Sequence, residues 1–232
     1  MKSDADKIKL VFPNAEKGRL FFTKQSILLE EDFGFTPENT HFSEGGCSDE
    51  INEPEYLLMQ HYWGERFKFG GLAGYCHGGK TGIYALSHHV PEIEGKKNLL
   101  IVGGPHIGFH NGVWGKCIRL GHKLATSSCG SIAEIMKSDF HDLKSKNPDP
   151  LDLQQHTVSQ ILRPYLKRCS EEGKQPDILE ATIFMLDKID SDLSSIITEL
   201  KDYFKGQVAL LTGITINTNS GNYFSPSIIK II

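Results

Sequence analysis

Two apolar segments constrain the fold of this chain most. Residues 208–216 form a run of β-branched and apolar side chains, and residues 98–102 form a shorter run of the same kind. Continuous apolar runs of this length are typical of fully buried strands, which occur mainly in α/β proteins. We therefore predict central strands at both positions and a closing strand over residues 224–232, after a turn at 219–222.

Helical patterns fill much of the remaining chain. The predicted helices cover residues 18–32 (ending near Gly34), 53–67, 131–136, 150–170 and 176–204. A short strand is predicted over residues 40–42, and a strand or hairpin within 112–123. A chain of 232 residues suits one large α/β domain, so we expect a single domain over residues 1–232.

Composition excludes several kinds of partner. The formal net charge is −4 and no basic stripe is present, so we expect no nucleic-acid binding. No apolar run approaches the roughly 18 residues of a membrane helix, and the polar start does not read as a signal peptide. We therefore expect a cytoplasmic protein. The five cysteines, an odd number, are expected to be buried thiols, metal ligands or nucleophiles rather than a disulfide framework.

A metal centre is the first interpretation of the cysteines. Cys47 follows a short strand and a glycine pair, and Asp49 stands two residues later. With His89 and Cys129, Cys47 would supply the three protein ligands that leave zinc one position for water. His88 competes with His89, because only one of two adjacent side chains faces a given point. Asp49 would accept a hydrogen bond from the water, would ligate the metal itself in a resting form, or would simply cap the following turn.

Other interpretations remain open from the residues alone. Cys129 with His89 as base and Asp49 as orienting group would resemble a thiol hydrolase. Residues 74–81 match the literal phosphate-loop pattern, although no apolar strand precedes them. His106, which follows the buried strand at 98–102, is the best of the remaining histidines for a role behind a metal ligand.

Several ordered motifs resemble one family, the limiting-carbon-dioxide-inducible B proteins. They lie at residues 34–40, 47–52, 70–74, 79–82, 88–91, 104–108 and 127–130, within a match from about residue 18 to 140. The family is similar to β-type carbonic anhydrases and includes the theta class. The resemblance implies an α/β fold with a central, mostly parallel sheet flanked by helices, a Cys-His-Cys zinc with an Asp beside it, and a homodimer.

The implied activity is the reversible hydration of carbon dioxide to bicarbonate. The sequence departs from the β-type pattern Cys-x-Asp-x-Arg, because position 51 is Ile. The cation that pairs with Asp49 must then come from elsewhere, and Lys80, Arg66 and Arg119 are the candidates. A non-catalytic homologue that binds zinc or bicarbonate, as a sensor or a subunit of an assembly, is the alternative.

Overall fold

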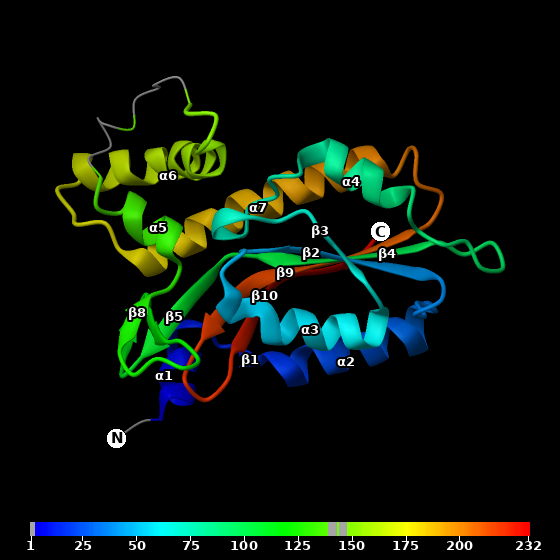
Figure 1. The fold of residues 1–232 in the computed structure, drawn as a ribbon, viewed down its shortest axis with the longest axis horizontal. Helices are drawn as coiled ribbons and strands as arrows, with labels where there is room; N and C mark the ends of the chain where they lie inside the picture. Colours follow the sequence, from blue (N-terminus) through cyan, green and yellow to red (C-terminus); the bar gives the residue numbers. More distant parts are fainter. Residues whose placement is uncertain (1–2, 139–142, 144–147) are drawn as a thin grey trace.

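The fold is organised around one mixed β-sheet that contains strands from both ends of the chain (Figure 1). The computed structural model describes residues 3–138, 143 and 148–232. The main path of the sheet has the order β1-β10-β9-β4-β2-β3, and β5 continues beside β9 and pairs with β6. The strands are β1 (Glu16–Lys17), β2 (Thr40–Gly46), β3 (Arg66–Lys68), β4 (Asn98–Gly104), β5 (His106–His110), β6 (Val113–Trp114), β9 (Gln207–Asn217) and β10 (Tyr223–Ile231).

The centre of this sheet is parallel. Strands β3, β2, β4 and β9 pair in parallel, whereas β10 runs antiparallel to β9 and closes that side. The expected strands at 98–102, 208–216 and 224–232 are all present, and the expected mostly parallel α/β architecture is confirmed. A separate two-stranded ribbon joins β7 (Lys116–Ile118) to β8 (Ala125–Ser127).

Helices cover both faces of the sheet (Figure 1). They are α1 (Asp4–Val11), α2 (Gly18–Phe33), α3 (Glu53–Trp63), α4 (Gly79–Ser87), α5 (Gly130–Ile135), α6 (Leu153–Glu171) and α7 (Ile178–Leu200), with 3-10 turns η1 (Glu50–Asn52) and η2 (Leu72–Gly74). Successive side chains of a strand point to opposite faces. Leu100 and Val102 of β4 accordingly pack with α2 and α3, while Leu99 and Ile101 pack with α4 and α7.

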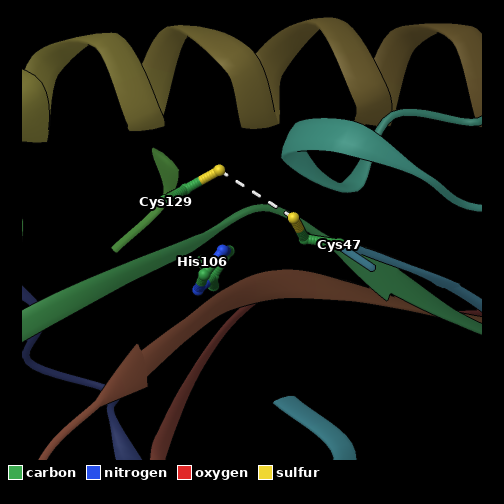
Figure 2. Close-up of side chains that lie close together, drawn as sticks. All are labelled: Cys47, His106 and Cys129. Atoms are coloured by element: carbon green, nitrogen blue, oxygen red, sulfur yellow. Dashed lines mark hydrogen bonds between the residues drawn. The ribbon is translucent and has the colours of Figure 1, made fainter. Parts of the chain in front are cut away.

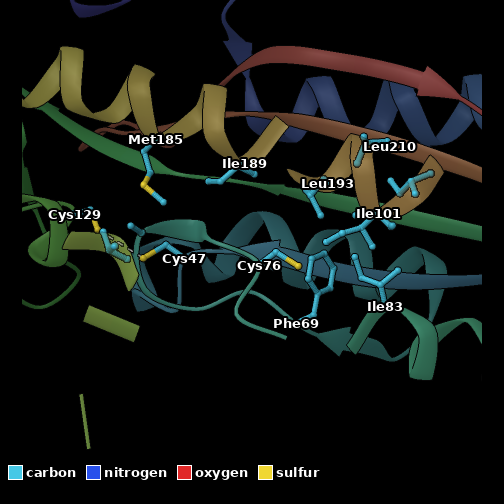
Figure 3. Close-up of a cluster of buried hydrophobic side chains, with 14 of the residues drawn as sticks. Cys47, Phe69, Cys76, Ile83, Ile101, Cys129, Met185, Ile189, Leu193 and Leu210 are labelled. Atoms are coloured by element: carbon cyan, nitrogen blue, oxygen red, sulfur yellow. Dashed lines mark hydrogen bonds between the residues drawn. The ribbon is translucent and has the colours of Figure 1, made fainter. Parts of the chain in front are cut away.

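Both faces of β4 and β9 are covered, which explains why their sequences are unbroken apolar runs. Figure 3 shows the cluster beneath α7, in which Ile189 and Leu193 meet Ile101 and Leu210 of the sheet. Burial of a large aliphatic side chain stabilises a fold by roughly 1.5–3 kcal/mol. These contacts fix the sheet edge from which the candidate site is built.

Element boundaries differ from expectation at the ends. Helix α2 ends at Gly34 in the left-handed conformation, as its sequence predicts. Helix α3 is shorter than the predicted 53–67, because Gly64 stops it and residues 66–68 form a strand beside β2. The sequence pattern does not predict helix α1 or strand β1. Helix α1 buries only Ile8, so its apolar periodicity is too weak to indicate a helix. No helix of the described chain is long and apolar enough to cross a membrane.

Close approach of two backbones explains Gly104 at the end of β4. Its φ is +138°, and a Cβ at this position would overlap the carbonyl oxygen of Gly213 on β9. Gly82 inside α4 is the opposite case, because a Cβ there would lie 4.0 Å from the nearest atom, on Phe69.

We predict opposite effects of alanine at these two glycines. Gly104→Ala lowers the free energy of unfolding by about 2 kcal/mol or more, because the backbones must separate. Gly82→Ala is neutral or raises it by up to about 1 kcal/mol, because alanine is the better helix former. Urea denaturation of both variants measures this. Equal stability of the Gly104 variant and the wild type would contradict the close packing of β4 on β9.

Candidate metal centre

The pairing of β2 with β4 brings two candidate ligands together. The strands are parallel neighbours, and Gly46 lies opposite Gly104 at their carboxyl ends. Cys47 follows β2 directly, and His106 follows β4 after Pro105. Residues that leave the carboxyl ends of adjacent parallel strands share one edge of the sheet, which is where open α/β sheets build their sites.

Cys129 reaches the same place from a different part of the chain. It follows the ribbon β7–β8 and precedes α5. The carbonyl oxygen of Ser128 accepts a hydrogen bond from the amide of Gly108, and the Ser128 amide donates to Gly115, which ties this segment to β5. The Sγ atoms of Cys47 and Cys129 are 3.8 Å apart (Figure 2).

Cys47, His106 and Cys129 therefore form one buried group. Their candidate ligand atoms all lie within 4.8 Å of one another, and the three residues are at most 4% exposed. His106 Nδ1 is 2.7 Å from Asn217 Oδ1, whereas His106 Nε2 is buried without a hydrogen-bond partner. Two sulfurs and a free imidazole nitrogen fit the ligand set of zinc, with the fourth position left open.

The electrostatics of the two thiols favour metal binding. The hydrogen bond from Cys47 and the neighbouring His106 hold the pKa of Cys129 well below its ordinary value, against the effect of burial. The same contact with Cys129, together with burial, raises the pKa of Cys47. Figure 3 shows both sulfurs at one end of the apolar cluster that contains Met185 and Ile189. A divalent ion would replace the shared proton and neutralise both thiolates.

Asp49 is paired with Arg119, which comes from the turn after β7. Arg119 Nη1 and Nη2 lie 2.5 and 2.9 Å from the two carboxylate oxygens of Asp49, a bidentate pair. Nη1 also bonds Glu50 at 2.6 Å, and Nη2 donates to the Ser127 carbonyl at 3.1 Å. Asp49 Oδ2 lies 3.6 Å from His106 Nε2, so the carboxylate borders the cluster.

Asp49 remains ionised because of this pairing. Burial alone would raise its pKa, but the hydrogen bonds and charge of Arg119 and the charge of His106 outweigh burial and lower it. Asp49 also accepts a weak bond from the Ile51 amide at 3.4 Å, so the turn-capping role considered from the sequence coexists with the ion pair. Arg119 thus occupies the role that the missing Arg at position 51 leaves open.

The structure corrects the choice of histidine. It brings Cys47, Cys129 and Asp49 together as expected, but with His106 and not with His89. His89 follows α4 and its ring lies 6.1 Å from the ring of His41, near the start of β2. That position is the amino end of the sheet, opposite the carboxyl end where Cys47 lies.

The physical reason for this correction lies in the chain path. The segment after α4 leads back to the start of β4, so a residue at the end of α4 stays at the amino edge. His88, the other candidate at this place, is exposed and its Nδ1 contacts the Tyr84 carbonyl at 2.7 Å. His106 could be identified from the sequence by its position after a predicted buried strand. Cys47 likewise follows a predicted strand.

The other cation candidates have different partners. Lys80 pairs with Glu199 of α7, on an exposed surface. Arg66 is nearly buried and pairs with Glu44 and Glu53. Residues 74–81, which match the phosphate-loop pattern, form the end of η2 and the start of α4, and Lys80 is engaged by Glu199.

Comparisons with known proteins show the family and the fold of this chain. The family model for the limiting CO2-inducible proteins B/C β-carbonic anhydrases matches residues 21–232. The crystal structure of PtLCIB4, a homolog of the limiting CO2-inducible protein LCIB, is similar with a TM-score of 0.85 at 30% identity, covering 98% of this chain and 94% of that one. The crystal structure of LCIB has a TM-score of 0.73 at 22% identity, covering 100% and 99%. A search of curated proteins finds no match.

We predict that the Asp49–Arg119 pair contributes more to stability than the Lys80–Glu199 pair. Arg119→Met lowers the free energy of unfolding by about 1–3 kcal/mol at neutral pH, because a largely buried carboxylate loses its bidentate partner. The matched control Lys80→Met leaves stability near that of the wild type, since its pair is solvent-screened. Denaturation by urea measures both.

The difference between Arg119→Met and the wild type is expected to depend on pH. The folded-state pKa of Asp49 lies below its ordinary value, so the contribution is present above that ordinary value and is lost as pH falls through the folded pKa. An undiminished difference in acid, or an equal loss in the Lys80 variant, would contradict the assignment.

Proposed function

Because the chain belongs to the family of limiting CO2-inducible proteins B/C β-carbonic anhydrases, we propose that it is a zinc-dependent carbonic anhydrase. Its reaction would be the reversible hydration of carbon dioxide to bicarbonate and a proton. The observation that carries this proposal is the buried Cys47, His106 and Cys129 cluster with the Asp49–Arg119 pair at its side. The resemblance also implies a homodimer, which we include in the proposal.

In this proposal the three clustered residues hold the zinc. Bound zinc would supply the Lewis acidity that makes water a nucleophile near neutral pH. Asp49 would accept a hydrogen bond from the attacking water and turn its lone pair toward the carbon of the substrate. Arg119 would keep Asp49 ionised and direct its carboxylate, since both carboxylate oxygens are bound to the guanidinium.

A small cavity beside the cluster supports a small substrate. Its volume is about 80 Å³, and Cys47 and Asp49 are among its lining residues. A cavity needs about 10–15 Å³ of such volume to hold one water molecule, so this one has room for a few small molecules. Glu44, Glu53 and Lys68 also line this cavity.

We predict one zinc per chain, with His106 and not His89 as the histidine ligand. His106→Ala and Cys47→Ser should lose most of the zinc that elemental analysis finds in the wild type. His89→Ala should retain it, because its ring lies at the other end of the sheet. Zinc loss in the His89 variant, with retention in the His106 variant, would refute the proposed ligand set.

We further predict that activity depends on the Asp49–Arg119 pair. Asp49→Asn should lower the rate of carbon dioxide hydration by about 100-fold or more, the usual loss for an acid–base group. Arg119→Gln should also lower it while zinc content stays unchanged, and Lys80→Gln should have the wild-type rate. Stopped-flow measurement of hydration provides the test.

The same assay separates the alternatives. Stoichiometric zinc with no hydration by the wild type would favour the non-catalytic homologue over the enzyme. A thiol hydrolase that uses Cys129 would lose activity on alkylation and would be indifferent to chelators. A zinc enzyme loses activity when a chelator removes the metal and regains it when zinc is restored.

A further inference from the structure

A buried amide, Asn217, contacts residues from all three segments that carry the candidate ligands. Asn217 is the last residue of β9 and is fully buried. Its Oδ1 lies 2.7 Å from His106 Nδ1 and 3.1 Å from the Oγ of Ser128, the residue before Cys129. Its Nδ2 donates to Asn52 Oδ1 at 3.1 Å.

Asn52 extends this contact to the third ligand. Its Nδ2 group lies 3.4 Å from the carbonyl oxygen of Cys47 and 3.2 Å from that of Asp49. Asn52 is itself only 3% exposed. The sequence places Asn52 and Asn217 far apart, and only the end of β9 beside β5 brings them to the same centre.

The direction of every bond in this network follows from one fact. A backbone carbonyl oxygen accepts hydrogen bonds and cannot donate, so Asn52 must present its NH2 group to Cys47 and Asp49. Its Oδ1 then faces Asn217 and accepts from Asn217 Nδ2. Asn217 Oδ1 is consequently turned toward His106 and accepts the hydrogen of His106 Nδ1.

These hydrogen bonds, from Asn52 through Asn217 to His106, determine the tautomer of His106. With the hydrogen held on Nδ1, Nε2 carries the free lone pair, and Nε2 is the buried ring nitrogen without a hydrogen-bond partner. Metal-binding histidines are commonly oriented in this manner by an acceptor behind the ring.

We infer that Asn217 is a positioning residue that holds His106 as the Nδ1-protonated tautomer and, with Asn52, fixes the spacing of the three ligand segments, and thereby sets the metal affinity. This inference rests on the proposed zinc centre. Asn217 does not touch the zinc or the substrate in this scheme, and it acts through His106.

The test compares Asn217→Leu with Asn217→Asp. Leucine removes the acceptor 2.7 Å from His106 Nδ1 and leaves only the longer contact with the hydroxyl of Ser128, at 3.2 Å, so we expect zinc affinity, measured by chelator competition, to fall 10–100-fold. Aspartate retains the acceptor for His106 Nδ1 but loses the hydrogen bond that Asn217 Nδ2 donates to Asn52 Oδ1, so we expect its affinity to fall less than that of the Leu variant, by about fivefold or less. The absorption spectrum of the cobalt-substituted protein should change in the Leu variant and stay close to wild type in the Asp variant.

Asn98→Leu is the matched control. Asn98 is also a buried strand asparagine, bonded to Asn39 and Gly34 at the opposite end of the sheet. It should lose stability to unfolding and retain zinc affinity and the cobalt spectrum. If Asn217→Leu does not fold, Asn217→Ala removes the same amide with less bulk and carries the same expectation.

Wild-type affinity and an unchanged cobalt spectrum in the Leu or Ala variant would overturn the inference, as would equal weakening in the Leu and Asp variants. None of these readouts needs turnover. A wild-type protein that binds zinc and does not hydrate carbon dioxide would contradict the proposed activity and leave the role of Asn217 intact.

Discussion

The candidate site depends on the parallel pairing of β2 with β4. The register that sets Gly46 opposite Gly104 also sets the directions in which Cys47 and His106 leave the sheet. Strands β4 and β5 both pair along β9, one after the other, so the position of His106 is fixed by the central strand itself. A one-residue slip of β2 would turn its side chains to the other face and move Cys47 away from the group.

The charge of the site is balanced by a residue from outside the sheet. A centre with two sulfurs and a carboxylate concentrates negative charge in a buried place, which is costly unless cations neutralise it. Arg119 supplies one positive charge from the turn between β7 and β8, and the same ribbon leads into Cys129. One excursion of the chain therefore provides both the third candidate ligand and the partner of Asp49, which couples the position of the cation to that of the metal.

Much of the fold and part of the site follow from local sequence. The apolar runs of β4 and β9 predict buried strands because both of their faces are covered, and Gly34 predicts the end of α2 through its left-handed conformation. Cys47 and Asp49 are recognisable since they follow a strand within three residues. The adjacent histidines His88 and His89 form a motif that predicts His89 as a ligand, and only the path of the chain after α4 shows that it lies at the amino end of the sheet. Arg119 and Asn217 act through contacts across 70 and 165 residues, which no local pattern encodes.

The asymmetry of hydrogen bonding around the cluster has a thermodynamic consequence. His106 Nε2 is buried without a partner, and the two thiols can share only one hydrogen bond with each other. A buried polar group without a partner costs about 1–3 kcal/mol, which favours binding of an ion by His106 Nε2. An ion that bound these three atoms would remove that cost and would stabilise the folded state by mass action as well. The Nδ1 side of His106 would gain nothing comparable from an ion, because Asn217 and Asn52 already provide its hydrogen bonds. The ring nitrogen without a partner, Nε2, thus faces the candidate metal position. The hydrogen-bonded nitrogen, Nδ1, holds the ring of His106 in place.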